Sequence, residues 1–345
     1  MARVLVTGAT GFIGSHLVPA LLARGDDVRV AVRASSKLGP LEGLDVERVT
    51  ADITDPKAMR RAARNMERAF HVAGTTNLRK AAADVLRTNA EGTRTVLDAC
   101  LAAKVERVVH VSSVAAIGPA RPGGALDERH VYVGPLGIPY ADAKHAAEVE
   151  ALRVAARGLD VVIACPGHVL GRGDERRSST EVVRRFLLRR IPAYVDGAIC
   201  IVDVEDVAAG LILCAERGAE RERYILGTRN YTWKRLFGEL ERFSGVEGPA
   251  VRLPLRAALA LAETAARAPG PTPITPSEVR AAAHWWTYRS AKARRELGWT
   301  TRPHEDTVES TVRFHEERLG DRIARNGRRQ PLSWRMVGRA TRLLP

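Results

Sequence analysis

Residues 7–14 read TGATGFIG and decide the fold of this 345-residue chain. The glycines Gly8, Gly11 and Gly14 follow a short apolar run and precede the amphipathic stretch Ile13–Arg24. Gly8 permits a tight turn, Gly11 lets the backbone approach a pyrophosphate, and Gly14 lets a helix pack closely on a strand. The free N–H groups at the start of that helix attract phosphate oxygens. The stretch therefore predicts a dinucleotide site at the first turn of a βαβ unit.

On both sides of this stretch, apolar runs alternate with amphipathic stretches through the first half of the chain. The strand-like runs are Val4–Val6, Val28–Val32, Phe70–Ala73, Arg107–Val111 and Asp160–Cys165. The helix-like stretches are Ile13–Arg24, Pro56–Arg64, Asp84–Ala103 and Tyr140–Arg157. Strands and helices that alternate at this spacing form βαβ units with right-handed crossovers. We therefore predict an α/β fold with a doubly wound parallel sheet, a Rossmann fold.

The second half of the chain has a different pattern. The alternation fades after Pro166, so we expect a smaller, mixed unit there. Ala268–Pro276 is rich in proline and indicates a connector. Thr275–Glu278 has the spacing of a capping box, with proline at the first helical position, and predicts a helix start.

The charge of the chain is concentrated at its C-terminal end. Lys and Arg number 54 against 40 Asp and Glu, and half of the resulting net charge of +14 lies in residues 318–345. The arginines of this basic tail are Arg318, Arg322, Arg325, Arg328, Arg329, Arg335, Arg339 and Arg342. We favour a solvated tail, and a weak contact with an anionic membrane surface is the alternative. Few aromatic residues accompany these arginines, which argues against a nucleic-acid partner.

The remaining composition excludes several classes of protein. No run of 18 apolar residues occurs, so we expect no membrane span. The four cysteines are far apart and form no CxxC pair, so neither a metal site nor a disulfide framework is expected. A soluble cytoplasmic protein with reduced thiols is the prediction.

The segment after the second predicted strand bears on cofactor choice. An NAD site usually has an acidic residue there, which holds the ribose hydroxyls. Here Arg33 follows Val28–Val32, and Ser35, Ser36 and Lys37 come next. A cation beside hydroxyls suits a 2′-phosphate, so we predict NADP(H) and regard NAD(H) as the weaker candidate. The alternative is that Arg33 is one arginine among many in a basic chain.

A tyrosine and a lysine form the candidate catalytic pair. Tyr140 and Lys144 are four residues apart on a predicted helix and therefore share one face. Ser112 and Ser113 end a predicted strand, at the carboxyl edge where parallel sheets bind ligands. A tyrosine whose pKa is lowered by a nearby lysine can exchange a proton near neutral pH. These residues predict proton-transfer chemistry beside the cofactor.

Together these motifs resemble the extended short-chain dehydrogenases/reductases, also called the NAD-dependent epimerase/dehydratase superfamily. The likeness rests on TGATGFIG at 7–14, HVSSVAAIG at 110–118 and YADAK at 140–144. It extends from residue 2 to about residue 315. Further matching segments are Asp52-Ile53, HVAG at 71–74, TNAEGTRTVLDAC around Asn89, Pro166-Gly167, VDVEDVA at 202–208 and SAKARRELGW at 290–299.

The resemblance implies roles for individual residues. Ser113 orients the substrate oxygen, Tyr140 is the acid/base, and Lys144 holds the nicotinamide ribose and tunes Tyr140. No metal is required. The implied cofactor-binding residues are Thr7, Gly8, Thr10, Gly11, Phe12, Ile13, Gly14, Arg33, Lys37, Asp52, Ile53, Ala73, Gly74, Thr75, Asn89, Tyr140, Lys144, Pro166, Gly167, His168 and Val169.

The family contains reductases, epimerases and dehydratases, and three departures favour a reductase. Val114-Ala115 follows Ser113 where dehydratases have an acidic pair. His168 stands where nucleotide-sugar epimerases usually have asparagine, and the apolar run Ile199–Ile201 replaces a pyrophosphate-binding arginine. The chain resembles the dihydroflavonol-4-reductase-like branch, which reduces a carbonyl with NADPH. A sugar epimerase and a non-catalytic NADP-binding protein remain the alternatives.

The resemblance also sets the expected domain layout. We expect a small-molecule substrate as partner, and a homodimer stays open. The predicted parts are an NADP-binding domain at 1–165 with 203–227 returning to it, a substrate-binding subdomain at 166–202 and 228–317, and the basic tail at 318–345.

Overall fold

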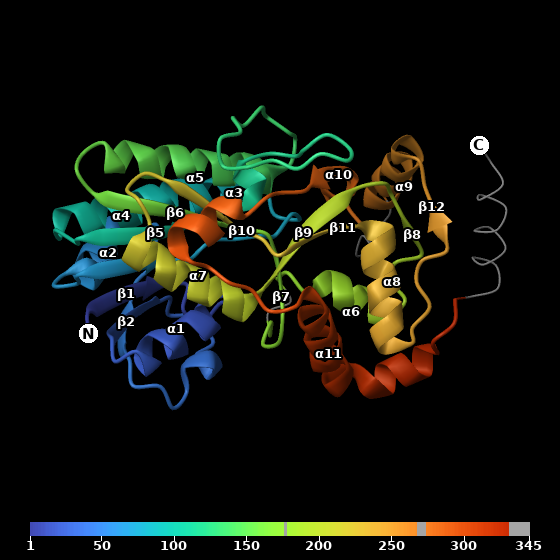
Figure 1. The fold of residues 1–345 in the computed structure, drawn as a ribbon, viewed down its shortest axis with the longest axis horizontal. Helices are drawn as coiled ribbons and strands as arrows, with labels where there is room; N and C mark the ends of the chain where they lie inside the picture. The colour runs from blue at the N-terminus through green and yellow to red at the C-terminus, as the bar shows by residue number, and fades with distance from the viewer. Residues whose placement is uncertain (176–177, 268–273, 331–345) are drawn as a thin grey trace.

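The structure is a computed structural model that describes residues 1–175, 178–267 and 274–330. Its largest element is a sheet of seven parallel strands in the order β10-β6-β5-β4-β1-β2-β3 (Figure 1). The predicted α/β class with a doubly wound parallel sheet is confirmed. The strands are β1 (Arg3–Thr7), β2 (Asp27–Val32), β3 (Glu47–Thr50), β4 (Arg68–His71), β5 (Arg107–Val111), β6 (Asp160–Pro166) and β10 (Arg223–Leu226).

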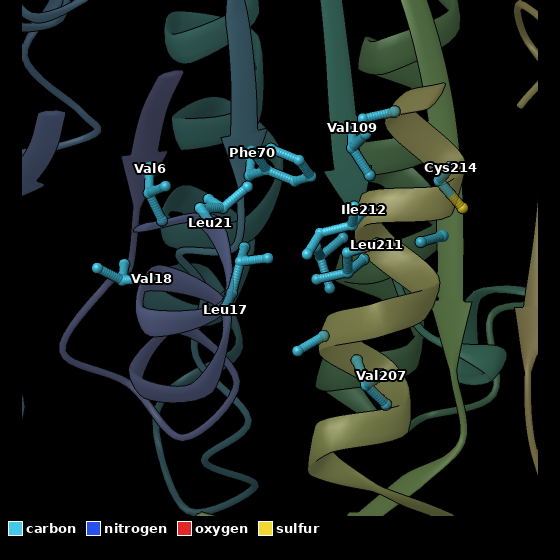
Figure 2. Close-up of a cluster of buried hydrophobic side chains, with 14 of the residues drawn as sticks. Val6, Leu17, Val18, Leu21, Phe70, Val109, Val207, Leu211, Ile212 and Cys214 are labelled. Carbon is cyan, nitrogen blue, oxygen red and sulfur yellow. The ribbon is translucent and has the colours of Figure 1, made fainter. Parts of the chain in front are cut away.

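Helices cover both faces of this sheet because its strands are apolar on both sides. Within β1, Val4 and Val6 join one buried cluster, whereas Leu5 joins the cluster on the opposite face. Figure 2 shows the first cluster, where α1 and α7 present apolar side chains toward the sheet. One face carries α1 (Gly14–Ala23) and α7 (Val204–Arg217); the other carries α2 (Pro56–Ala63), α3 (Ala82–Leu86), α4 (Gly92–Ala102) and α5 (Pro139–Ala155).

The strand order reverses beside β1, and this reversal positions the site. The chain moves outward from β1 to β3, then returns to β4 on the other side of β1. The crossover helices diverge at such a point and leave a crevice at the carboxyl edge of the sheet. Thr7 and His71 end the two central strands there, and Val111 ends β5 beside them. The glycine stretch and the serine pair therefore lie along one edge.

The second region lies beyond this edge and is built on a smaller sheet of mixed strand direction (Figure 1). Its centre is β9 (Ala198–Asp203), which is buried along its whole length. The strands β7 (His168–Leu170), β11 (Arg229–Thr232) and β13 (Trp285–Trp286) pair with β9, and β8 (Ala193–Tyr194) pairs with β12 (Val251–Arg252). Its helices are α6 (Glu181–Leu187), α8 (Trp233–Ser244), α9 (Leu255–Arg267), α10 (Pro276–Ala283) and α11 (His304–Asn326).

The predicted helix Asp84–Ala103 is wrong as one continuous α-helix. A π-helical turn, Arg87–Glu91, separates α3 from α4. Gly92 follows this turn, and a Cβ atom there would lie 2.8 Å from Cδ1 of Ile53. The wider turn and the glycine together let the chain pass close to Ile53 and direct Asn89 inward, where it is buried.

The predicted tail begins too early. Helix α11 continues through 318 to Asn326, because Leu319 and Ile323 are buried against the second region. Gln330 is also buried, and its backbone N–H donates to Glu247. The rest of the predicted tail, residues 331–345, lies outside the described residues.

Two further expectations concern the C-terminal half and the membrane. The capping box at Thr275 and Glu278 is confirmed, with both reciprocal hydrogen bonds present. Most of the proline-rich connector, residues 268–273, lies outside the described residues. Within the part of the chain that the structure describes, no helix is long and apolar enough to cross a membrane.

Candidate active site

The glycine stretch forms a tight turn between β1 and α1. Gly8 has a φ of +74°, and a Cβ atom on it would lie 2.6 Å from the backbone N of Ala73. Gly14 is equally restricted, because a Cβ atom there would overlap the carbonyl of Gly8. A Cβ atom on Gly11 would meet only the carbonyl oxygen of Gly8, at 3.1 Å, so the other side of Gly11 is open. This cradle fits a pyrophosphate at the N-terminus of α1.

The other residues of this turn line the same edge. Thr10 and Phe12 are buried, and Ile13 is half-buried directly before α1. Thr7 ends β1, and its Oγ1 accepts a hydrogen bond from the backbone N–H of Ala73 at 3.3 Å. This bond helps to hold the turn in place.

A chain of buried hydrogen bonds connects β1, β4 and α4 beneath the turn. Thr7 Oγ1 lies 2.8 Å from Nδ1 of His71, and Nε2 of His71 lies 3.0 Å from Oγ1 of Thr93. Thr93 donates to the carbonyl of Asn89 at 2.5 Å. Burial and the nearby charge of Lys144 lower the pKa of His71 to about 3, so its imidazole is neutral. These hydrogen bonds connect the central strands to the π-helical turn.

Asn89 then fixes the loop that follows β4. Its Oδ1 accepts from the backbone N–H of Thr75 at 2.9 Å, and its Nδ2 donates to the carbonyl of Thr75 at 3.0 Å. A Cβ atom on Gly74 would lie 2.8 Å from Oδ1 of Asn89 and 3.5 Å from Nζ of Lys144. The structure therefore brings Gly74, Thr75 and Asn89 together beside Lys144. Only glycine leaves this space at position 74.

The predicted adenosine end lies at the carboxyl ends of β2 and β3. Arg33 and Lys37 are exposed, and the backbone N–H of Arg33 donates to Ser36 Oγ at 3.1 Å. Burial acts to raise the pKa of Asp52, but hydrogen bonds from Thr54 and the charges of Arg33 and Arg87 lower it overall. Arg33 and Asp52 are therefore near neighbours. The exposed guanidinium and ammonium groups fit a phosphate.

Ser113 and Tyr140 meet at the end of β5. Ser113 is the N-cap of a short 3₁₀ turn, Val114–Ala116, and its Oγ accepts from the backbone N–H of Ala115 at 3.2 Å. Burial raises the pKa of Tyr140, while a hydrogen bond with Ser113 acts to lower it. The prediction that Lys144 lowers this pKa is wrong, because desolvation dominates and raises it. The phenol is protonated at neutral pH and suits proton donation.

Lys144 lies one helical turn after Tyr140 and is buried. Its Nζ donates to the carbonyl of Val111 at 2.8 Å. Burial lowers its pKa from 10.5 to about 8, and the charge of Glu148 opposes this shift. The ammonium is therefore charged at neutral pH, and it stands between the loop after β4 and the end of β5.

The segment after β6 forms the far side of the edge. Pro166 and Val169 are buried, and the backbone N–H of Gly167 donates to the carbonyl of Leu226 at 2.9 Å. A Cβ atom on Gly167 would lie 2.6 Å from the carbonyl of Cys200. Burial lowers the pKa of His168, so this half-buried imidazole is neutral. These residues connect the large sheet to β9.

The sequence reasoning missed Tyr288, which holds the turn that follows Ser113. Its buried hydroxyl lies 2.9 Å from the carbonyl of Val114 and 2.6 Å from that of Gly118. Nδ2 of Asn230 donates to the carbonyl of Tyr288 at 3.0 Å, and Oδ1 of Asn230 accepts from the backbone N–H of Tyr288 at 3.0 Å. An isolated tyrosine 175 positions beyond Ser113 gives no local signal of this contact.

Tyr140 also faces an apolar surface that the sequence did not reveal. Tyr140 packs against the small buried cluster of Ala115, Ile138 and Ala141, and side chains from the loop after β4, the loop before α5, α10 and β13 pack against the same cluster. These side chains are Leu78, Leu136, Ala281 and Trp286. A substrate oxygen that reaches Tyr140 therefore enters a largely apolar setting.

Comparison with known proteins agrees with this geometry. Residues 4–227 match the NAD dependent epimerase/dehydratase family, and this range contains the glycine stretch and the three catalytic candidates. The chain is 38% identical over 304 residues to a Synechocystis sp. protein provisionally named dihydroflavonol 4-reductase, covering 85% of this chain and 88% of that protein.

Two further proteins show the same relationship. The chain is 37% identical over 244 residues to cinnamoyl-CoA reductase 1 of Oryza sativa subsp. japonica, covering 65% of this chain and 71% of that enzyme. The crystal structure of gox2253 superposes with a TM-score of 0.80 at 31% identity, covering 92% of this chain and 99% of gox2253. The resemblance to the dihydroflavonol-4-reductase-like branch is confirmed.

Proposed function

Because this chain belongs to the NAD dependent epimerase/dehydratase family and is an NAD(P)-dependent reductase or dehydrogenase, we propose a specific reaction for it. It is an NADP(H)-dependent oxidoreductase that acts between a carbonyl and an alcohol of a small organic substrate. Ser113, Tyr140 and Lys144 carry out the proton chemistry. NADP(H) is the preferred cofactor over NAD(H).

The meeting of Ser113 and Tyr140 beside Lys144 carries this proposal. When bound, the nicotinamide supplies or accepts the hydride. Tyr140 is protonated because its pKa is raised by burial, so it can donate a proton to the substrate oxygen. Ser113 orients that oxygen through its hydroxyl. Lys144 is charged and lies one helical turn after the proton donor, where its ammonium would hold the nicotinamide ribose.

The cofactor preference rests on the adenosine end of the site. Arg33 and Lys37 are exposed at the end of β2, where an NAD site would present a carboxylate. Asp52 is nearby, but its charge is engaged by Thr54 and by the guanidinium of Arg33. The 2′-phosphate of NADP(H) would gain an ion pair with these cations, whereas the 2′-hydroxyl of NAD(H) carries no charge and would not.

The substrate class is inferred from the surface around Tyr140. Leu78, Leu136 and Trp286 offer little to a nucleotide diphosphate, which needs cations or hydrogen-bond donors. Ile199–Ile201 lies inside the buried strand β9 and supplies no such group. An apolar or aromatic carbonyl compound fits better. Two relatives whose names denote reductases of such compounds support this assignment.

One experiment separates the proposal from its alternatives. Purified protein is incubated with NADPH or NADH, and separately with NADP⁺ or NAD⁺, and three sets of compounds: aromatic ketones and aldehydes, aliphatic ketones, and nucleotide sugars. We expect NADPH oxidation with a compound of the first two sets. Interconversion of nucleotide sugars without net oxidation of cofactor would establish an epimerase. Tight NADPH binding with no turnover of any set would establish a binding protein.

A further inference from the structure

Helix α5 carries a third polar residue on the face of Tyr140 and Lys144. Glu148 follows Lys144 by four residues, as Lys144 follows Tyr140, so the three side chains share one side of the helix. Glu148 is only 4% exposed. A buried carboxylate is costly unless other groups satisfy it, so its partners require an explanation.

Three strands of the large sheet supply those partners. Ser112, at the end of β5, donates to Oε1 of Glu148 at 2.5 Å, and Sγ of Cys165 in β6 lies 3.5 Å from the same oxygen. A guanidinium nitrogen of Arg223, at the start of β10, lies 3.6 Å from Oε2. Both oxygens therefore face a donor, and one faces a cation. Burial raises the pKa of Glu148 overall, while the hydrogen bonds from Ser112 and Cys165 and the charge of Arg223 oppose this shift and favour the ionised form.

The two adjacent serines divide between the two sides of the site. Ser113 forms a hydrogen bond with Tyr140, whereas Ser112 donates to Glu148. The end of β5 is thus in contact with the first and the third polar residue of the α5 face. Lys144 lies between them and donates to Val111, the last residue of β5.

We propose that Glu148 is a positioning residue that keeps Lys144 charged beside Tyr140. This inference rests on the proposed function of that site. Lys144 is buried, and the hydrogen-bond acceptor that the structure gives its ammonium is a neutral carbonyl. A negative charge one helical turn away favours the charged form of a buried lysine. Glu148 acts through Lys144 and does not contact the reacting atoms.

The other titratable groups around this pair cannot replace Glu148. Burial raises the pKa of Cys165 well above its ordinary value, so its thiol stays neutral. Burial lowers the pKa values of His71 and His110, so both imidazoles are neutral beside Lys144. Arg223 and His145 act on Glu148 and stabilise its charge, whereas Glu128 acts on Cys165 from the loop before α5. Glu148 is therefore the anion that acts on Lys144 among these neighbours.

The test measures the titration of Lys144 directly. Lysine labelled with ¹³C at Cε gives one signal for each of the seven lysines, and Lys144→Arg identifies the signal of Lys144. In Glu148→Gln, which removes the charge but keeps the shape, we expect the pKa of Lys144 to fall by roughly one unit. Glu148→Asp, which keeps the charge, should restore most of that shift. Glu150→Gln on the same helix, where Glu150 pairs with exposed Arg153, should change nothing.

Turnover gives a second readout. The alkaline limb of the pH profile should move to lower pH in Glu148→Gln by the same amount as the titration of Lys144. Should Glu148→Gln not fold, Ser112→Ala removes one donor from the carboxylate and should lower the pKa of Lys144 in the same direction. An unchanged Lys144 titration in the folded variant overturns the inference. Because the titration needs no substrate, this result is independent of whether the proposed reaction is correct.

Discussion

The large sheet and the second region are held together in different ways. Strands of the large sheet have four to seven residues, and backbone pairing between parallel neighbours sets their ends. In the second region, β8, β12 and β13 have two residues each, and side chains secure the segments around them. Trp233 Nε1, for example, donates to the carbonyl of Ala282 at 2.7 Å.

The candidate catalytic residues come from the large sheet and its helices, and the second region supports them. The large sheet and its helices supply Ser113, Tyr140 and Lys144, together with the glycine turn. The second region approaches them through side chains, of which Tyr288 is the best example. Substitutions in the first region should therefore change catalysis most, and those in the second region should change it through the shape of the 113–118 loop.

The largest effect is expected from Tyr140→Phe. This change removes the proton donor and keeps the ring, so turnover should fall by roughly two to four orders of magnitude. NADPH affinity should barely change. Steady-state kinetics and a cofactor titration measure both quantities. Tyr224→Phe, a buried tyrosine bonded to Ala219 and Glu296, is the matched control and should keep normal turnover. Undiminished turnover in Tyr140→Phe would exclude the mechanism.

Arg33→Asp tests the adenosine end of the first region. A hydrogen bond to a charged group contributes about 1.5–3 kcal/mol. Its loss should therefore weaken NADPH binding by roughly ten- to a hundredfold, and the new carboxylate should improve NADH binding. Isothermal titration with both cofactors gives the ratio of affinities. Equal affinity of the natural protein for NADPH and NADH would contradict the assignment.

Tyr288→Phe tests whether the second region stabilises the 113–118 loop. The carbonyls of Val114 and Gly118 lose their buried donor, which costs about 1–3 kcal/mol of stability. We expect a lower Tm and a turnover reduced by about tenfold, since Ser113 begins the loosened loop. Tyr224→Phe should lower Tm similarly but leave turnover intact. Normal turnover in Tyr288→Phe would show that the two regions are uncoupled at this point.

From the lowered pKa of Lys144 we expect activity and stability to change in opposite directions as the pH rises. Its pKa is about 8 in the folded protein, so cofactor binding and turnover should fall as the pH rises through about 8. Between about 8 and its ordinary value of 10.5, the unfolded chain binds a proton that the folded chain does not. The free energy of unfolding should therefore gain a contribution as pH rises through that window. Urea unfolding should show this gain, and Lys144→Met should lack it.

The smallest effect is expected at the C-terminal end. Removal of residues 331–345 should leave the fold and NADPH affinity unchanged, because Gln330 and the buried residues of α11 remain. Co-sedimentation with anionic vesicles should be weak for the full chain and for the shortened chain. Strong binding that disappears with added salt or with this deletion would instead assign the arginines to a membrane surface.

In both regions, the sequence predicts those features whose signals are local. The turn at Gly8 and the capping box at Thr275 each depend on residues within a few positions. The π-helical turn at Arg87–Glu91 was missed because the contacts beside it, such as that of Ile53 with Gly92, involve residues distant in the sequence. The extension of α11 past Arg318 depends likewise on burial that an arginine-rich segment does not suggest.

The candidate site shows the same division. The spacing of Tyr140 and Lys144 and the position of Ser113 could be inferred from the chain alone. The roles of Tyr288 and Glu148 could not, because they depend on which strand ends become neighbours in the sheet. The raised pKa of Tyr140 is also a property of burial, which the sequence pattern did not reveal.

The central claim is that this chain transfers hydride to a carbonyl with Tyr140 as proton donor. The most direct measurement uses NADPH deuterated at the transferable position of C4, with mass spectrometry of the products from apolar carbonyl compounds. We predict one deuterium on the carbinol carbon of the product with the natural protein and a strongly reduced yield with Tyr140→Phe. Bound NADPH that gives deuterium to no carbonyl compound, or an equal yield with Tyr140→Phe, would contradict it.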